Sequence, residues 1–222
     1  MNPLIALNLK AYKESIGERG LALCRIADEV AKETGASIIV APQNVDLFRV
    51  VKAVSIPVFA QHIDWNVPGA FTGSITADAV KEAGCQGTLL NHAEKKIALE
   101  KIQLCIELAR KGGIKTLLCA DSVDEAKRIA PLKPDFIAVE PPELIGSGVS
   151  VSKAKPEIVS NTVEAVKSIQ NIPVLCGAGV SNGEDVRKAV ELGADGVLLA
   201  SAFVKASNPR AVLLEMANAA RE

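Results

Sequence analysis

The chain has 222 residues, of which 49% are apolar and 3% aromatic, and its 25 Lys and Arg almost balance its 26 Asp and Glu. A chain of this composition can bury a core, but it lacks the basic excess that binding to nucleic acid requires. Its apolar runs are all far shorter than the roughly 20 residues that a membrane-spanning helix needs. The sequence therefore predicts a globular protein with neither nucleic-acid nor membrane partners.

The N-terminal residues and the cysteines indicate the cellular compartment. The first residues, MNPLIALNLKAY, contain no cleavable secretory signal. The five cysteines are odd in number, lie inside apolar segments and include no CxxC pair, which favours buried free thiols over disulfides or a zinc cage. We expect a cytoplasmic protein without a metal site.

Short aliphatic runs alternate along the chain with longer segments whose apolar residues recur every three or four positions. The runs predict eight strands, at Leu4–Leu9, Ser37–Ala41, Pro57–Ala60, Gly87–Leu90, Lys115–Cys119, Phe136–Val139, Pro173–Cys176 and Gly196–Leu199. The longer segments predict helices at Glu18–Glu33, Val45–Val54, Thr76–Ala83, Ala98–Arg110, Val123–Ala130, Lys155–Ile169, Gly183–Leu192 and Arg210–Ala220. Two of these helices are expected to start with a capping box, Ser122-x-x-Glu125 and Ser181-x-x-Glu184.

The predicted strands are continuous aliphatic runs rather than alternating ones, which is typical of a parallel sheet covered on both faces. Eight strand–helix units in 222 residues give about 28 residues each, enough for a short strand, a helix and two tight loops. We therefore predict one (β/α)8 TIM-barrel domain over residues 1–222. An open doubly wound sheet is the alternative.

In a (β/α)8 barrel the chemistry lies at the C-terminal ends of the strands, so the polar residues that follow each apolar run are candidates. Asn8 and Lys10 follow the first run, His92 and Glu94 follow the fourth, and Glu140 follows the sixth. Neither His62 nor His92 has metal-ligand spacing, and each is also compatible with a structural role. Glu140, flanked by apolar residues, is a plausible general base, and a salt-bridged strand end is the alternative.

The seventh and eighth runs end in small residues, Cys-Gly-Ala-Gly at 176–179 and Ala-Ser-Ala at 200–202. Small residues before a helix offer backbone amides that can bind phosphate, although Gly177 and Gly179 could also simply turn the chain. Between Glu140 and the next predicted helix lies PPELIGSGVSVSKAKP, a long segment with prolines at one end and glycines at the other. We expect it to be a lid over the substrate, with an ordered Ω-loop as the alternative.

These segments together resemble the triosephosphate isomerase family, in its short archaeal form. The resemblance rests on Asn8-x-Lys10, AQHIDWNVPGAFTG at 60–73, LLNHAEKK at 89–96, EPPELIG at 140–146, CGAG at 176–179 and LLASA at 198–202. It covers the whole chain, motif by motif and in order. It implies a cofactor-independent isomerisation of a phosphorylated triose, glyceraldehyde 3-phosphate to dihydroxyacetone phosphate, in glycolysis and gluconeogenesis.

The resemblance also assigns roles. Glu140 matches the family's base, His92 its neutral electrophile and Lys10 the cation at the substrate, with Asn8 as a hydrogen-bonding neighbour and Glu94 as a buried carboxylate near Lys10. In this family the surroundings of the histidine keep it neutral beside the carboxylate base. Ile145 and Gly146 match the lid, and together with Gly179, Ala200 and Ser201 they would give amides to the phosphate. Thr72 matches a loop that enters a neighbouring subunit toward its Lys10, which implies a homodimer or homotetramer.

Two departures from the family pattern stand beside the catalytic histidine. The family's usual Ser is Ala93, and its usual Glu-Arg-Arg is Glu94-Lys95-Lys96, a change that removes an arginine's bidentate hydrogen bonding. Two other functions remain to be weighed: another phosphate-binding barrel, such as a phosphoribosyl isomerase or a sugar-phosphate epimerase, and a barrel that binds triose phosphate without converting it.

Overall fold

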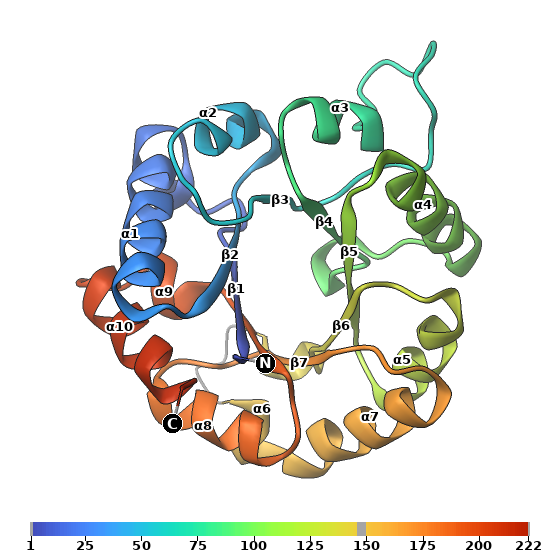
Figure 1. Ribbon diagram of the computed structural model, residues 1–222. Helices are drawn as coiled ribbons and strands as arrows, with labels where there is room; N and C mark the ends of the chain where they lie inside the picture. The colour runs from blue at the N-terminus through green and yellow to red at the C-terminus, as the bar shows by residue number, and fades with distance from the viewer. Residues whose placement is uncertain (1, 146–149, 222) are drawn as a thin grey trace.

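The computed structural model describes residues 2–145 and 150–221, and these residues form a barrel of eight parallel strands enclosed by helices (Figure 1). The strands run in the order β2-β1-β8-β7-β6-β5-β4-β3. Their bounds are β1 (Leu4–Asn8), β2 (Ser37–Ala41), β3 (Phe59–Ala60), β4 (Gly87–Leu90), β5 (Lys115–Ala120), β6 (Phe136–Val139), β7 (Val174–Gly177) and β8 (Gly196–Leu199). The predicted barrel is confirmed, and the open doubly wound alternative is wrong.

The ring closes between β2 and β3, which are the ends of the strand order. There a single parallel bridge joins Val40 to Val58, and the Val40 N–H donates to the Pro57 carbonyl at 3.1 Å. The first strand, in contrast, pairs over most of its length with both β2 and β8. The seam at β2–β3 is therefore the part of the described barrel with the least backbone pairing.

The helices lie outside the ring and follow the predicted segments. Their bounds are α1 (Glu18–Thr34), α2 (Leu47–Val51), α3 (Ala77–Glu82), α4 (Leu99–Gly112), α5 (Val123–Ile129), α6 (Val151–Ala154), α7 (Pro156–Ile169), α8 (Gly183–Glu191), α9 (Ser201–Val204) and α10 (Pro209–Ala219). The short helices α6 and α9 were not predicted, because four residues carry too little periodicity to be recognised. The predicted helix at 45–54 is divided into a 3-10 turn at Asn44–Asp46 and α2.

The two predicted caps differ in outcome. Ser122 accepts the Glu125 N–H at 3.2 Å, as predicted, whereas the Glu125 carboxylate accepts the N–H of Asp121 rather than that of Ser122. The second box is wrong by one residue, because Asn182 is the N-cap of α8 and accepts the Asp185 N–H.

The core has two layers. Side chains such as Ala6, Leu117 and Leu175 fill the inside of the barrel, and a larger set, including Ile5 and Leu118, packs between the strands and the helices. Alternate residues of one strand thus face opposite layers, which explains why the strands read as continuous apolar runs. Among the described residues no helix has the length and hydropathy of a membrane span.

Candidate active site

The C-terminal ends of the strands surround a cavity of about 190 Å³. Eight of the residues singled out in the sequence lie on its wall, namely Asn8, Lys10, His92, Glu140, Ile145, Gly179, Ala200 and Ser201. They come from the first, fourth, sixth, seventh and eighth strand–helix units, which lie far apart in the chain. The barrel therefore brings together most of the residues that the sequence indicated.

Lys10 enters the cavity from a strained backbone position. Its backbone φ is 49°, and a residue other than glycine adopts this conformation at a free-energy cost of about 1–3 kcal/mol. Neighbouring groups hold it there: the Asn8 side chain accepts the Lys10 N–H at 3.0 Å, and the Gln61 amide donates to the Lys10 carbonyl at 3.0 Å. The buried ammonium is 2.7 Å from Glu94 Oε1. The result is a positive charge fixed at the cavity wall.

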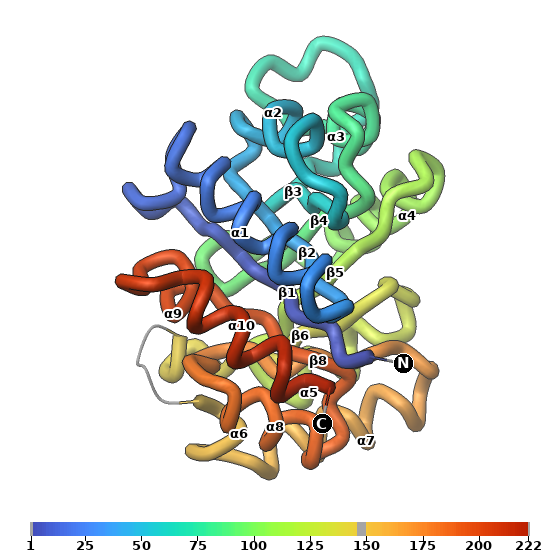
Figure 2. The backbone as a smooth tube through the Cα atoms, turned by 60° about the vertical axis from the view of Figure 1, so that its left-hand side comes forward, coloured from blue at the N-terminus to red at the C-terminus, as the bar shows by residue number. Residues whose placement is uncertain are grey.

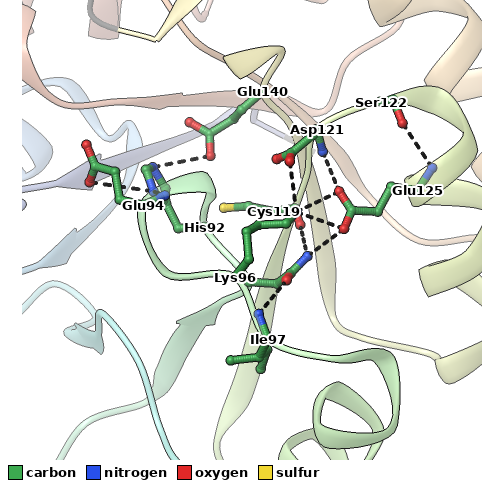
Figure 3. A network of polar contacts seen from close by, with 10 residues as sticks. His92, Glu94, Lys96, Ile97, Cys119, Asp121, Ser122, Glu125 and Glu140 are labelled. Carbon is green, nitrogen blue, oxygen red and sulfur yellow. Dashed lines mark hydrogen bonds and ion pairs between the residues drawn. The ribbon is translucent and has the colours of Figure 1, made fainter. Parts of the chain in front are cut away.

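His92 has its tautomer set by the backbone. Its Nδ1 accepts the Glu94 N–H at 3.1 Å, so the ring proton of the neutral imidazole is on Nε2. The His92 ring is buried, and Nε2 lies 3.6 Å from Glu140 Oε2 (Figure 3). His92 therefore presents an N–H donor to the same space that Glu140 faces.

Glu140 is a buried carboxylate with an unused oxygen. Its side chain is only 6% exposed, and Oε2 makes no hydrogen bond among the described residues. Its N–H donates to the Ala120 carbonyl at 2.8 Å, which extends the pairing of β5 and β6 up to the residue that carries the carboxylate. A buried and unsatisfied carboxylate is unfavourable for folding, so its presence in a cavity points to a chemical role.

Two small residues hold the Glu140 side chain. A Cβ on Gly177 would be 2.3 Å from Glu140 Cγ, so only glycine leaves room for the carboxylate in this position. Cys119, at the end of β5, interacts with Glu140 through its thiol; burial and then the Glu140 charge raise the pKa of Cys119 well above its ordinary value. Cys119 therefore stays a neutral thiol beside the carboxylate. The sequence pointed to neither residue for this purpose.

Part of the cavity wall is made of small residues. Ala178 and Gly179 both have positive φ, at 68° and 70°, and α9 begins with its first turn at the cavity. The first amides of a helix have no partner within the helix, so this part of the wall offers N–H groups rather than side-chain charge. Ala202, from the predicted Ala-Ser-Ala segment, also lines the cavity. Tyr12, Val180, Ser181, Leu198 and Leu199 line it too and were not predicted, because nothing in the sequence sets them apart from ordinary loop and core residues.

Two predicted residues lie outside the cavity wall, and a third is not described. Glu94 is next to Lys10 as expected, but its side chain is 57% exposed rather than buried, because no segment within the described residues covers it. Thr72 is exposed on the segment between β3 and α3, away from the cavity. Gly146 is outside the described residues. The predicted lid segment contains a 3-10 turn at Pro142–Leu144 and the short helix α6, and its ion pair between Glu143 and Lys155 joins its two ends.

His62, the second histidine, belongs to a structural cluster rather than to the cavity. Its Nε2 is 3.1 Å from Asp64 Oδ1, and the other oxygen of Asp64 accepts the Ile75 N–H at 2.7 Å. Burial lowers the pKa of His62, the Asp64 hydrogen bond opposes this shift, and the Lys95 charge adds to it. The pair thus fastens both ends of the segment between β3 and α3, with His62 neutral.

Acidification should therefore destabilise the protein through His62. Because the folded state lowers the pKa of His62, the stabilisation from its neutral form is complete above about pH 6.5 and is lost as the pH falls toward the lower folded pKa. We expect the free energy of unfolding in urea to fall over this range, and to fall less in His62→Gln. Identical pH dependence in the two proteins would assign the effect to other groups.

The fold and the cavity together define a class: a (β/α)8 enzyme that combines a buried carboxylate, a neutral imidazole and a lysine with a wall suited to phosphate. The family model described as triosephosphate isomerase matches residues 3–220. The triosephosphate isomerase of Methanocaldococcus jannaschii is 53% identical over 214 residues, which cover 96% of this chain and 98% of that protein. That of Methanothermus fervidus is 51% identical over 215 residues, 96% and 97% of the two chains. The chain belongs to the triosephosphate isomerase family, and it is an isomerase.

A solved structure agrees on the fold. The crystal structure of triosephosphate isomerase from Bartonella henselae superposes with a TM-score of 0.78 over 100% of both chains, at 19% identity. At 19% identity, this structural similarity supports a shared barrel fold and nothing more specific. The relatives from Methanocaldococcus and Methanothermus carry the family assignment, and they agree with the short archaeal form that the sequence motifs resemble.

Proposed function

We propose that Glu140, His92 and Lys10 catalyse the interconversion of glyceraldehyde 3-phosphate and dihydroxyacetone phosphate through an enediolate. Glu140 removes a proton from the carbon beside the carbonyl and returns it to the neighbouring carbon. The Nε2–H of His92 and the ammonium of Lys10 stabilise the charge that develops on the two oxygens. The observation that carries this assignment is the unsatisfied Oε2 of Glu140, which lies 3.6 Å from His92 Nε2 at the cavity.

The substrate phosphate is held by backbone amides of the cavity wall. Ile145, Gly179, Ala200 and Ser201 line the cavity, and their amides, with that of Gly146 in the lid, are the proposed donors. Lys10 adds the charge, and the Asn8 side chain fixes the Lys10 backbone. Fixed hydrogen bonds and this one cation stabilise the enediolate, so the proposed reaction uses no cofactor and no metal.

Coupled turnover of glyceraldehyde 3-phosphate tests the proposal. The wild-type protein should convert it to dihydroxyacetone phosphate, and inorganic phosphate should compete with the substrate. Binding of phosphate ligands without turnover would favour a triose-phosphate-binding barrel, and turnover of a phosphoribosyl or sugar-phosphate substrate instead would favour the other enzymatic alternative.

We also propose that the protein is a homo-oligomer built on a dimer. The segment between β3 and α3 projects from the barrel (Figure 2), and it exposes Trp65, Val67 and Phe71, at 36%, 56% and 48%. A groove of about 310 Å³ lies beside Lys10, with Val45 on its wall at 88% exposure. Apolar side chains this exposed are unfavourable in a monomer. Entry of this segment into a partner's groove would cover them and would bring Thr72 toward the partner subunit's Lys10, beside the exposed Glu94.

Light scattering should give a mass of at least two chains. Phe71→Asp places a charge in the proposed interface, so we expect it to shift the mass toward one chain and to lower kcat, because Lys10 and Glu94 lose their cover. Leu104→Asp is the matched control, since Leu104 on α4 is 41% exposed but lies outside this segment and groove. A monomeric wild type with full activity would contradict the proposal.

The proposed cellular setting follows from the reaction. Interconversion of the two triose phosphates belongs to glycolysis and gluconeogenesis, which proceed in the cytoplasm. The five cysteines support a reducing compartment, because all of them are buried and free.

A further inference from the structure

The loop that carries His92, residues 91–97, is hydrogen-bonded near both of its ends to the carboxylate of Glu125. Asn91, just before His92, donates from Nδ2 to Glu125 Oε1 at 3.0 Å. Lys96, four residues after His92, donates from Nζ to both oxygens of Glu125 at 2.7 Å (Figure 3). Both ends of the loop therefore meet at Glu125, although Glu125 lies outside the cavity.

Asn91 also closes the loop on itself and ties it to the barrel. Its Oδ1 accepts the Ile97 N–H at 3.2 Å, and its Nδ2 donates to the Cys119 carbonyl at the end of β5 at 3.0 Å. Its φ of 58° is one that asparagine tolerates better than most residues, and its side chain is buried. The chain thus turns sharply just before His92 with all of the Asn91 amide in use.

Glu125 is a firm attachment point. It lies in the first turn of α5 and accepts the Asp121 N–H at 2.7 Å in addition to Asn91 and Lys96. Burial tends to raise the pKa of Glu125, but the hydrogen bonds from Asp121, Lys96 and Asn91 outweigh burial and lower it. The Lys96 ammonium also lies 3.1 Å from Asp121 Oδ2. The carboxylate therefore remains charged and immobilised.

The other contacts of His92 and its loop hold the imidazole less firmly relative to the barrel. The N–H groups of Glu94 and Lys95 bond to His92 from within the loop, so they orient the ring relative to the loop but move with it. The Lys10–Glu94 pair joins the loop to β1, but Glu94 is 57% exposed and the pair is correspondingly screened. Among the described residues, the side chains of Asn91 and Lys96 tie the loop to the end of β5 and to the start of α5, and β5 pairs with β6, which leads directly into Glu140.

We propose that Lys96 and Glu125, together with Asn91, are positioning residues that hold the His92 imidazole opposite Glu140. This rests on the proposed role of His92 as the electrophile. The lysine that replaces the family's usual arginine lacks a guanidinium fork, but its single ammonium still reaches both carboxylate oxygens, so the ion pair with Glu125 is kept. The three residues touch neither the cavity nor the reacting atoms and act through His92 alone.

Lys96→Met tests the proposal, because the Lys96 side chain is 35% exposed and its loss leaves no large cavity. We expect kcat to fall by about 10- to 100-fold, as for a displaced catalytic group, with KM within about twofold. Glu125→Gln should also lower kcat and leave KM nearly unchanged. Lys96→Arg should retain kcat within about threefold, because a guanidinium can bridge the same carboxylate. Lys188→Met is the control, since Lys188 pairs with Glu191 on the surface of α8 and should leave kcat unchanged.

The ring-nitrogen NMR signals of the two histidines report the protonation and surroundings of each imidazole, which a general loss of stability would not change. With His62 assigned by His62→Gln, the wild type should show His92 protonated on Nε2 alone, as the Glu94 N–H bond to Nδ1 requires. Lys96→Met should keep this tautomer, because that bond moves with the loop, but should shift and broaden the Nε2 signal as the ring moves relative to Glu140. Unchanged kcat in Lys96→Met, or reduced kcat with wild-type His92 signals, would overturn the proposal. If the wild type lacked isomerase activity, the proposed function would fail, whereas the NMR comparison would still decide the positioning role.

Discussion

Glu140→Asp should lower kcat by about 100- to 10,000-fold, the range that a positioned general base contributes. The substitution keeps the carboxylate but shortens the side chain by one methylene. In the wild type Glu140 Oε2 reaches to 3.6 Å from His92 Nε2 and has no other partner among the described residues. The shorter side chain withdraws the oxygen from the place where the substrate carbon must lie.

Inhibition by inorganic phosphate provides the control for Glu140→Asp, because the proposed phosphate donors are backbone amides of other cavity residues, which the substitution leaves in place. The inhibition constant for phosphate should stay within about twofold of the wild-type value, since the substitution does not change the groups that bind phosphate. A wild-type kcat in Glu140→Asp would mean that another residue is the base.

Gly177→Ala should also disable the enzyme, although it adds only a methyl group. The new Cβ would lie 2.3 Å from Glu140 Cγ and 2.9 Å from Cδ, so the carboxylate has to leave its position. We expect kcat to fall by about 100-fold, as for other displacements of about 1 Å. Gly112→Ala is the matched control, because a Cβ at that position on α4 meets nothing within 4 Å.

A thermodynamic cycle separates displacement of the base from general damage. In the wild-type background Gly177→Ala should lower the free energy of unfolding by about 1–3 kcal/mol, the usual cost of overpacking. In a Glu140→Ala background the clashing atoms are gone, and the cost should be smaller. Equal costs in both backgrounds would show that Gly177 accommodates some other neighbour.

Much of the fold and part of the site could be predicted from the sequence, because the information is local. Runs such as SIIVA at 37–41 are strands by composition, and Asn8, Lys10, His92 and Glu140 stand out as polar residues at the ends of apolar runs. A barrel then requires these ends to meet. The apolar neighbours of Glu140 already suggested a general base, whereas the roles of the other three residues came from the resemblance to a family.

What could not be predicted depends on contacts between distant segments. Glu125 looks like an ordinary capping residue in the sequence, and only the packing of α5 against β5, the neighbour of β4, brings it to Asn91 and Lys96. The start of α8 shows the same limit on a small scale. Ser181-x-x-Glu184 and Asn182-x-x-Asp185 are both acceptable caps, and the second prevails because Asp185 also accepts the N–H and hydroxyl of Ser181.

The pairing of β1 with β8 has a consequence for how the enzyme is made. Lys10 leaves the ribosome long before Ser201, yet both line one cavity, and β1 has its second neighbour only when Gly196–Leu199 has emerged. Contacts of such long sequence separation form late. Catalytic activity should therefore be acquired in one step after β8 has been synthesised, and the appearance of turnover reports that the ring of strands is complete.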